Sequence, residues 1–272
     1  MALVFMSCSK KNRSGCFERV FSHISNENAS TPGLGYCLGV WNISEIILLM
    51  SRHLQSVESD FRAQNAYQGL DSLAEVQLHP LLCQAFADSS MGVLREVGYP
   101  SSPKSRPNQT QRQRCDLVLT PHAGQPLFDP IDEQRERDRA VGTLFESAAK
   151  THEPNPGDAQ PQDAFWIEVK SVGQFSYVEG VPGPNPKYTN ELLGGPKADV
   201  IKLASDPLIH HGASLIVLFA EEENIGSHDI TASASAMLNH DLPISLPIFE
   251  SFEITNHAEN AWCTLGLIPI RL

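Results

Sequence analysis

The sequence predicts an α/β protein in which helices flank a mixed β-sheet. Apolar residues recur at helical spacing in residues 43–61. Short apolar runs typical of strands occupy residues 115–120, 165–172 and 214–220. Further helical stretches alternate with these runs. Because a helix or a half-buried strand needs an apolar partner layer, this alternation favours a sheet covered by helices.

The part of the chain before the first strand is predicted to hold an extension followed by helices. Residues 1–40 show no sustained periodicity, so we expect a weakly ordered extension there. The helix predicted at residues 43–61 has core packing as its first interpretation and a homodimer contact as its second. Ser72 and Glu75 have the spacing of a capping box, which predicts a helix that begins at Ser72. Pro80 then kinks this helix or opens a new one.

Three strands are predicted in the middle of the chain, at residues 93–99, 115–120 and 165–172. An insertion, residues 121–164, separates the second strand from the third. It holds a charged helix at about residues 131–150, followed by a loop rich in Pro, Gly, Asp and Gln.

The third strand is followed by a connection rich in Gly and Pro, residues 180–186. The next helix is predicted to be interrupted at Gly194 and Gly195 and to restart at Pro196, which suits a first helical position. The continuous apolar run of residues 214–220 indicates a buried central strand.

The C-terminal part is predicted to form a helix at residues 229–239 and two strands, residues 251–255 and 261–268. The turn between these strands is typical of a hairpin. We therefore expect one domain, residues 41–272, that ends in a hairpin at about residues 250–270.

Composition limits the class of protein. The 272 residues carry a formal net charge of −12, so any contact with nucleic acid must be local or assisted by a metal. The loop of residues 101–114, with four basic residues and no acidic one, is the candidate contact, or else a solvated polar loop. Six cysteines without paired Cys-x-x-Cys spacing indicate a reduced, cytoplasmic protein, and no apolar run reaches the length of a membrane span.

Glu168 and Lys170 form the candidate catalytic pair. They lie two residues apart on a predicted strand, so both side chains project from the same face. A surface ion pair is the alternative interpretation. The apolar flanks, which include Trp166, favour a buried setting, and Asp116 begins another apolar run. If the two strands are neighbours, Asp116 and Glu168 can together hold a hard divalent cation.

These residues resemble the PD-(D/E)XK, or restriction-endonuclease-like, nuclease superfamily. The resemblance covers about residues 70–220 and rests on Asp116, on Glu168-x-Lys170 and on the order helix, three strands, helix, strand. Cys115 replaces the proline that gives the motif its first letter, and 51 residues separate Asp116 from Glu168. The resemblance implies a restriction-endonuclease-like core and Mg²⁺-dependent hydrolysis of phosphodiester bonds, with DNA favoured over RNA as substrate and Mn²⁺ as a substitute metal.

The resemblance also implies roles for single residues. Asp116, Glu168 and the backbone carbonyl of Val169 would bind the metal, and Lys170 would orient or help deprotonate the attacking water. Further candidates are an acidic residue on the first helix, a residue near phosphate and two substrate-binding arginines: Glu75, Gln174, Arg112 and Arg114.

Two interpretations of single residues stay open. Glu96 on the first strand could serve in place of Glu75 or could simply face water, and Asp199 and Lys202 have the spacing of a solvent-side ion pair on one helix.

Two alternatives to the nuclease also stay open. The chain could be a non-catalytic module on the same fold that binds a partner or nucleic acid. It could also hydrolyse another phosphoester.

Overall fold

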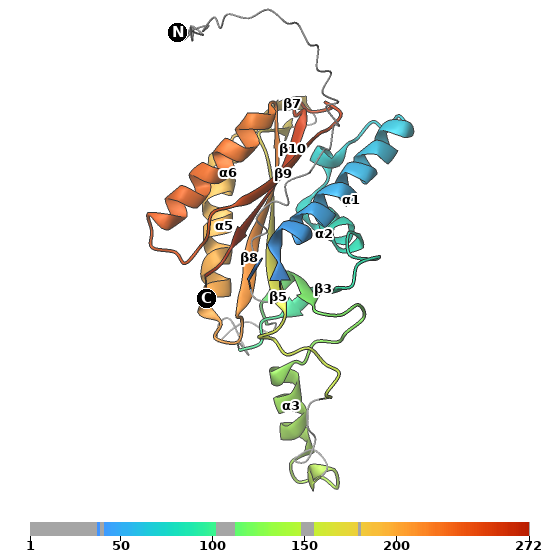
Figure 1. Cartoon of the computed structure of the whole chain (residues 1–272), viewed down its shortest axis with the longest axis vertical. Coiled ribbons are helices and arrows are strands. Elements are labelled where there is room, and N and C mark those ends of the chain that lie inside the picture. Colours follow the sequence, from blue (N-terminus) through green and yellow to red (C-terminus); the bar gives the residue numbers. More distant parts are fainter. Residues whose placement is uncertain (1–36, 39–40, 102–111, 148–154, 179–180, 272) are drawn as a thin grey trace, which may run out of the picture. The chain divides into compact units, whose positions relative to one another are not determined.

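A six-stranded sheet is the centre of the computed structural model, which describes residues 37–38, 41–101, 112–147, 155–178 and 181–271 (Figure 1). The described residues lie within one compact unit, Gly35–Leu272. In spatial order the strands are β3 (Gly92–Gly98), β4 (Arg114–Thr120), β5 (Phe165–Gly173), β8 (His211–Ala220), β10 (Trp262–Pro269) and β9 (Ile248–Glu253).

The sheet is mixed, as predicted. Its neighbouring strands pair antiparallel except β5 and β8, which pair in parallel. A parallel pair needs a crossover, and the helix α5 (Tyr188–Ser205) supplies it. The predicted hairpin near the C-terminus is the antiparallel pair of β9 and β10.

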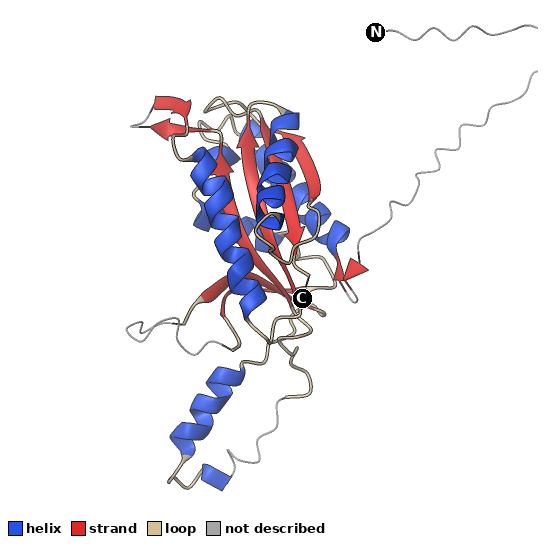
Figure 2. Ribbon diagram, turned by 90° about the vertical axis from the view of Figure 1, so that its left-hand side faces the viewer, coloured by secondary structure: helices blue, strands red, loops and turns tan. Residues whose placement is uncertain are grey.

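Helices cover both faces of the sheet (Figures 1 and 2). The layer of α1 (Ile43–Ala63) and α2 (Glu75–Gln84) packs on one apolar cluster, and the layer of α5 and α6 (Glu223–Leu238) packs on a second. Strand alternation assigns each residue of β5 to a layer. Ile167 and Val169 join the α1 and α2 cluster, whereas Trp166 joins the other. Glu168 and Lys170 therefore project toward the α5 layer.

The capping box predicted at Ser72 is wrong. Ser72 ends a short 3₁₀ turn, η1 (Leu70–Ser72), and its hydroxyl donates to the carbonyl of Gly69. The helix α2 begins three residues later, where the side chain of Gln77 accepts the N–H of Ala74. Because Glu75 is not needed at the cap, its carboxylate is available to other partners.

The predicted break in α5 is also wrong, since the helix runs through Pro196 without interruption. Proline lacks the N–H that would bond the carbonyl four residues earlier, which belongs to Leu192. The hydroxyl of Ser233 on α6 donates to this carbonyl at 2.8 Å. A neighbouring helix thus supplies the missing hydrogen bond.

The shorter elements differ in part from the prediction. The helix α3 (Pro130–Ala140) ends earlier than expected, because Val141 is extended and Gly142 adopts a positive φ. The predicted connection near residues 180–186 contains half of an unpredicted hairpin, β6 (Phe175–Val178) and β7 (Val181–Pro184). A two-residue pair, β1 (Cys37–Leu38) and β2 (Trp41–Asn42), precedes α1. The predicted extension otherwise lies outside the described residues.

No helix within the described ranges is both long and apolar enough to cross a membrane.

The contact of α6 with the sheet makes a first prediction. A Cβ atom added to Gly226 would lie 2.2 Å from Oγ1 and 2.6 Å from Cβ of Thr264 on β10. We expect Gly226→Ala to lower the free energy of unfolding by about 1–3 kcal/mol through overpacking, measured by urea denaturation. Gly194→Ala is the matched control, because nothing lies within 4 Å of its added Cβ and it should gain about 0.5–1 kcal/mol. Equal effects of the two substitutions would contradict this packing.

Candidate metal centre

Three carboxylates lie in one row across β3, β4 and β5. The register pairs Arg95 with Leu117 and Leu117 with Ile167. Continued by one residue, the same register places Glu96, Asp116 and Glu168 opposite one another. Like charges at directly opposed strand positions are destabilising. The row therefore needs cationic partners.

The central strands stop pairing at this row. The last β4–β5 pair is Leu117 with Ile167, and beyond it Oδ2 of Asp116 accepts the N–H of Val169 at 2.8 Å. The side-chain carboxylate thus takes the place of a backbone carbonyl in the ladder. This bond fixes the Asp116 carboxylate at the point where β4 and β5 part.

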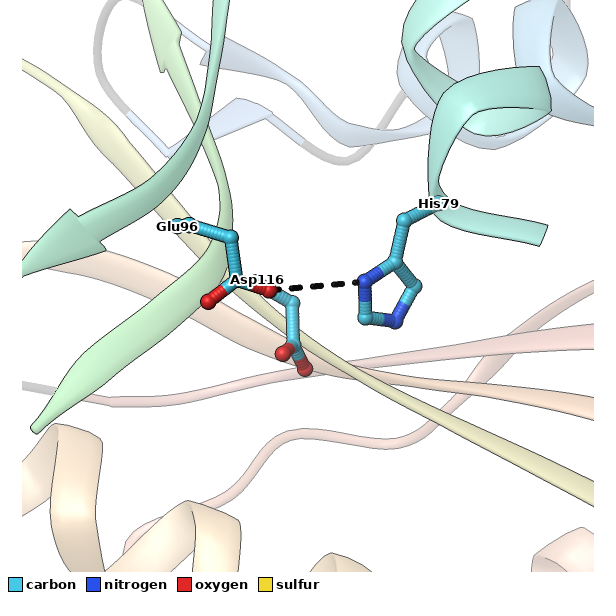
Figure 3. Close-up of side chains that lie close together, drawn as sticks. All are labelled: His79, Glu96 and Asp116. Carbon is cyan, nitrogen blue, oxygen red and sulfur yellow. Dashed lines mark ion pairs between the residues drawn. The ribbon is translucent and has the colours of Figure 1, made fainter. Parts of the chain in front are cut away.

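Glu96 also interrupts the ladder, because its φ of 52° lies in the left-handed region. Such a conformation costs a non-glycine residue on the order of 1–3 kcal/mol and concentrates at functional sites. The carboxylate of Glu96 lies 3.9 Å from Nδ1 of His79 on α2 (Figure 3). One ligand atom from each of His79, Glu96 and Asp116 lies within 4.8 Å of the others. This group could hold a metal ion.

The buried side chain of His79 is an independent indication that this group binds a metal ion. Its side chain is 4% exposed, and neither ring nitrogen has a hydrogen-bond partner among the described residues. A buried polar group without a partner is costly, so natural proteins rarely leave one. A neutral imidazole with an unbonded nitrogen is a common metal ligand.

Glu168 is held on the other face of the row. It is 2% exposed, and its Oε1 accepts from the hydroxyl of Tyr99 at 2.5 Å and from the ammonium of Lys202 at 2.9 Å. Burial, then the charges of Asp116 and Asp199, raise the pKa of Glu168 to about 7, although Lys202 and Tyr99 act in the opposite direction. A bound cation is a natural way to keep this carboxylate ionised.

Lys170 is held by two carboxylates. Its Nζ lies 3.2 Å from Oε1 of Glu75 and 3.4 Å from Oδ2 of Asp199, and it donates to the carbonyl of Val169 at 2.9 Å. Burial lowers the pKa of Lys170, but Asp199 and Glu75 raise it by more, so the net pKa is raised. Gly195 leaves room for the lysine, since an added Cβ would lie 2.9 Å from its Cδ.

The expected solvent-side pair of Asp199 and Lys202 is wrong. The two side chains are bonded at 2.9 Å, but that of Asp199 is only 4% exposed. The face of α5 that carries them lies against β5, where Lys202 also bonds Glu168. The pair therefore belongs to the site.

The remaining predicted residues lie in different settings. Arg112 has a side chain 8% exposed that donates to both oxygens of Asp129 and to the carbonyls of Gly98 and Tyr99. Arg114 is exposed and donates to the carbonyl of Glu96. These contacts give Arg112 a structural role, since its guanidinium is already bonded within the protein.

Two further candidates, Val169 and Gln174, are also bonded within the protein. The carbonyl of Val169 accepts from Lys170, and Oε1 of Gln174 accepts the N–H of Glu221 at the end of β8. Glu75 accepts the N–H of Ser171 as well as bonding Lys170. The sequence prediction missed His79 and Tyr99. The spacing of Glu75 and His79, four residues apart on one helix, was a usable signal for His79.

Comparisons with known proteins add no assignment, because no protein-family model, no curated protein and no solved structure matches the chain.

The raised pKa of Glu168 makes a prediction about stability without metal. The pKa in the folded protein, about 7, lies above the ordinary value of 4.5, so folding favours the protonated form. The contribution of Glu168 to the free energy of unfolding should therefore fall as the pH rises from about 4.5 through 7. At pH 8 in EDTA, we expect the free energy of unfolding of Glu168→Gln to exceed that of the wild type by on the order of 1–3 kcal/mol. This difference should vanish near pH 4. A difference independent of pH would contradict the electrostatic cause.

The group of His79, Glu96 and Asp116 makes a prediction about metal binding. We expect Mn²⁺ to raise the melting temperature of the wild type, because a ligand at 100 times its Kd stabilises by about 2.7 kcal/mol. His79→Ala and Glu96→Gln should remove most of this rise in thermal denaturation scans. His240→Ala, which removes an exposed histidine elsewhere, is the control. A full Mn²⁺ response in Glu96→Gln would exclude this residue as a ligand.

Proposed function

We propose that this chain is a divalent-metal-dependent nuclease with a restriction-endonuclease-like core. The observation that carries the proposal is the Asp116 carboxylate, fixed where two central strands part. It is grouped with His79 and Glu96 and electrostatically coupled to Glu168 and Lys170. The elements α2, β3, β4, β5, α5 and β8 follow one another in this order, with α3 inserted after β4 and the hairpin of β6 and β7 after β5, and this order supports the same proposal.

The donor set favours Mn²⁺ over Mg²⁺. Carboxylate oxygens suit Mg²⁺ and Mn²⁺ alike, whereas an imidazole nitrogen suits transition metals. Asp116 and Glu168 alone would offer oxygen ligands, and the addition of His79 makes the set mixed. We therefore expect both ions to support activity and Mn²⁺ to bind more tightly.

When bound, the cation supplies a Lewis acid and lowers the pKa of a coordinated water. The protein residues position the charges around the phosphate. Glu75 and Asp199 keep Lys170 in place as an ammonium, which suits it to stabilise negative charge on the pentavalent phosphorus rather than to act as a base. Tyr99 and Lys202 hold the carboxylate of Glu168 in a fixed orientation, and Glu168 would be a further ligand if the cation extends to it from Asp116.

One observation favours the non-catalytic alternative. Oε1 of Glu168 already has a hydroxyl and an ammonium as partners, so this oxygen is hydrogen-bonded without a metal. In a non-catalytic module, Glu168, Lys202 and Asp199 would simply form a buried ion-pair network. The two functions differ in whether the protein cuts nucleic acid.

Cleavage of labelled single-stranded and double-stranded DNA and RNA tests the proposal. We expect the purified wild type to cut DNA in Mn²⁺ or Mg²⁺ and not in EDTA. Lys170→Ala should lower the rate at least about 100-fold, because it removes the cation that offsets transition-state charge. Its circular dichroism spectrum should stay unchanged.

Lys197→Ala is the matched control for the loss of one positive charge. Lys197 lies on α5, as Lys202 does, and is not one of the residues assigned to the candidate metal centre. A wild type that binds Mn²⁺ but cuts none of the four substrates would reject the nuclease and favour the non-catalytic module.

A further inference from the structure

The edge strand β3 borders a cavity of about 520 Å³. Four arginines and three acidic residues line it: Arg95, Arg112, Arg114, Arg135, Glu96, Asp129 and Asp132. Its lining therefore carries a formal charge of +1, in a chain whose net charge is −12. The cavity is locally basic on an acidic protein.

Two of the arginines are neutralised by partners within the cavity. Arg112 bonds both oxygens of Asp129 at 2.9 and 2.7 Å. Arg135 pairs with Asp132 at 2.7 Å. Once these two pairs are set aside, the charges of Arg95 and Arg114 are offset within the lining by one remaining carboxylate, that of Glu96.

Arg95 and Arg114 are exposed and have no carboxylate at ion-pair distance among the residues that the structure describes. Arg95 precedes Glu96 in the chain, and Arg114 donates to the carbonyl of Glu96 at 3.1 Å. Both arginines line the same cavity as Glu96, the residue that links the cavity to the candidate metal centre. If Glu96 binds a cation, the cavity keeps no free acidic group to offset them.

We propose that this cavity binds the phosphodiester backbone of a nucleic acid strand beside the metal centre, with Arg95 and Arg114 each contacting a phosphate. The proposal rests on the proposed function. Arginine forms strong, often bidentate, bonds with phosphate. The position of β3 at the edge of the sheet suits a polymer, because a chain can extend past an edge strand.

The salt dependence of binding tests the proposal. We would measure the affinity for a fluorescent single-stranded DNA oligonucleotide by anisotropy at several salt concentrations, with Lys170→Ala as the parent protein so that the probe stays intact. Each phosphate contact contributes about 0.7 to the slope of log K against log salt for single strands. Adding Arg95→Ala and Arg114→Ala should therefore reduce the magnitude of this slope by about 1.4. The two substitutions should also weaken binding at least about tenfold at low salt.

Two matched controls should keep the parent slope. Arg135→Ala removes a cavity arginine that is already paired, and Arg52→Ala removes an exposed arginine on α1. The single variant Arg95→Ala, with an expected change of about 0.7, keeps the test valid if the double variant does not fold.

The outcomes separate this inference from the nuclease. An unchanged slope in folded Arg95→Ala and Arg114→Ala variants, or no binding by the parent, would overturn the phosphate contacts even if the wild type cuts DNA. Arginine-dependent binding by a wild type that never cuts would support the binding surface and reject the nuclease. Loss of binding in Arg135→Ala to the same degree would also overturn the assignment, because it would indicate a general charge effect.

Discussion

The constraint on which the site depends is the electrostatic repulsion within one row of three carboxylates. The register of β3, β4 and β5, continued by one residue, places Glu96, Asp116 and Glu168 at neighbouring strand positions. The surrounding chain reduces this repulsion in three ways. Asp116 accepts a backbone N–H, Glu168 accepts an ammonium and a hydroxyl, and the backbone at Glu96 adopts a positive φ beside His79. Each adjustment interrupts regular strand pairing or buries a charge, and such features are concentrated at functional sites.

The two lysines of the site have different relations to this row. Lys202 bonds Glu168 directly, so it supplies the positive charge that a buried carboxylate requires in the absence of metal. Lys170 instead bonds Glu75 and Asp199, which lie outside the row. Lys202 therefore offsets the charge of Glu168 directly, whereas Lys170 is paired with carboxylates outside the row. Both lysines share Asp199 as a partner. Burial raises the pKa of Glu168 despite Lys202, so ionisation of this site is costly, as it is at many functional sites.

The sequence predicted the class of fold and the strands well, because apolar runs and helical periodicity depend on local composition. Some of its errors, such as the capping box at Ser72, are local, and others arose where distant residues decide the outcome. Pro196 lies inside a helix because Ser233, 37 positions later in the chain, bonds the carbonyl that proline leaves free. Glu168 and Lys170 could be placed on one face of a strand because strand alternation is local. The role of Lys202 was missed, because only the packing of α5 on β5 brings it to Glu168.

The central claim is that Asp116 is a ligand of a divalent cation at the point where β4 and β5 part. The most direct measurement is the anomalous difference map from crystals of the wild-type protein grown with Mn²⁺. The claim predicts a peak at metal-to-oxygen distance, about 2.0–2.6 Å, from a carboxylate oxygen of Asp116, with further ligands among His79, Glu96 and Glu168. A fully occupied Mn²⁺ peak elsewhere, or no peak beside an ordered Asp116, would contradict it.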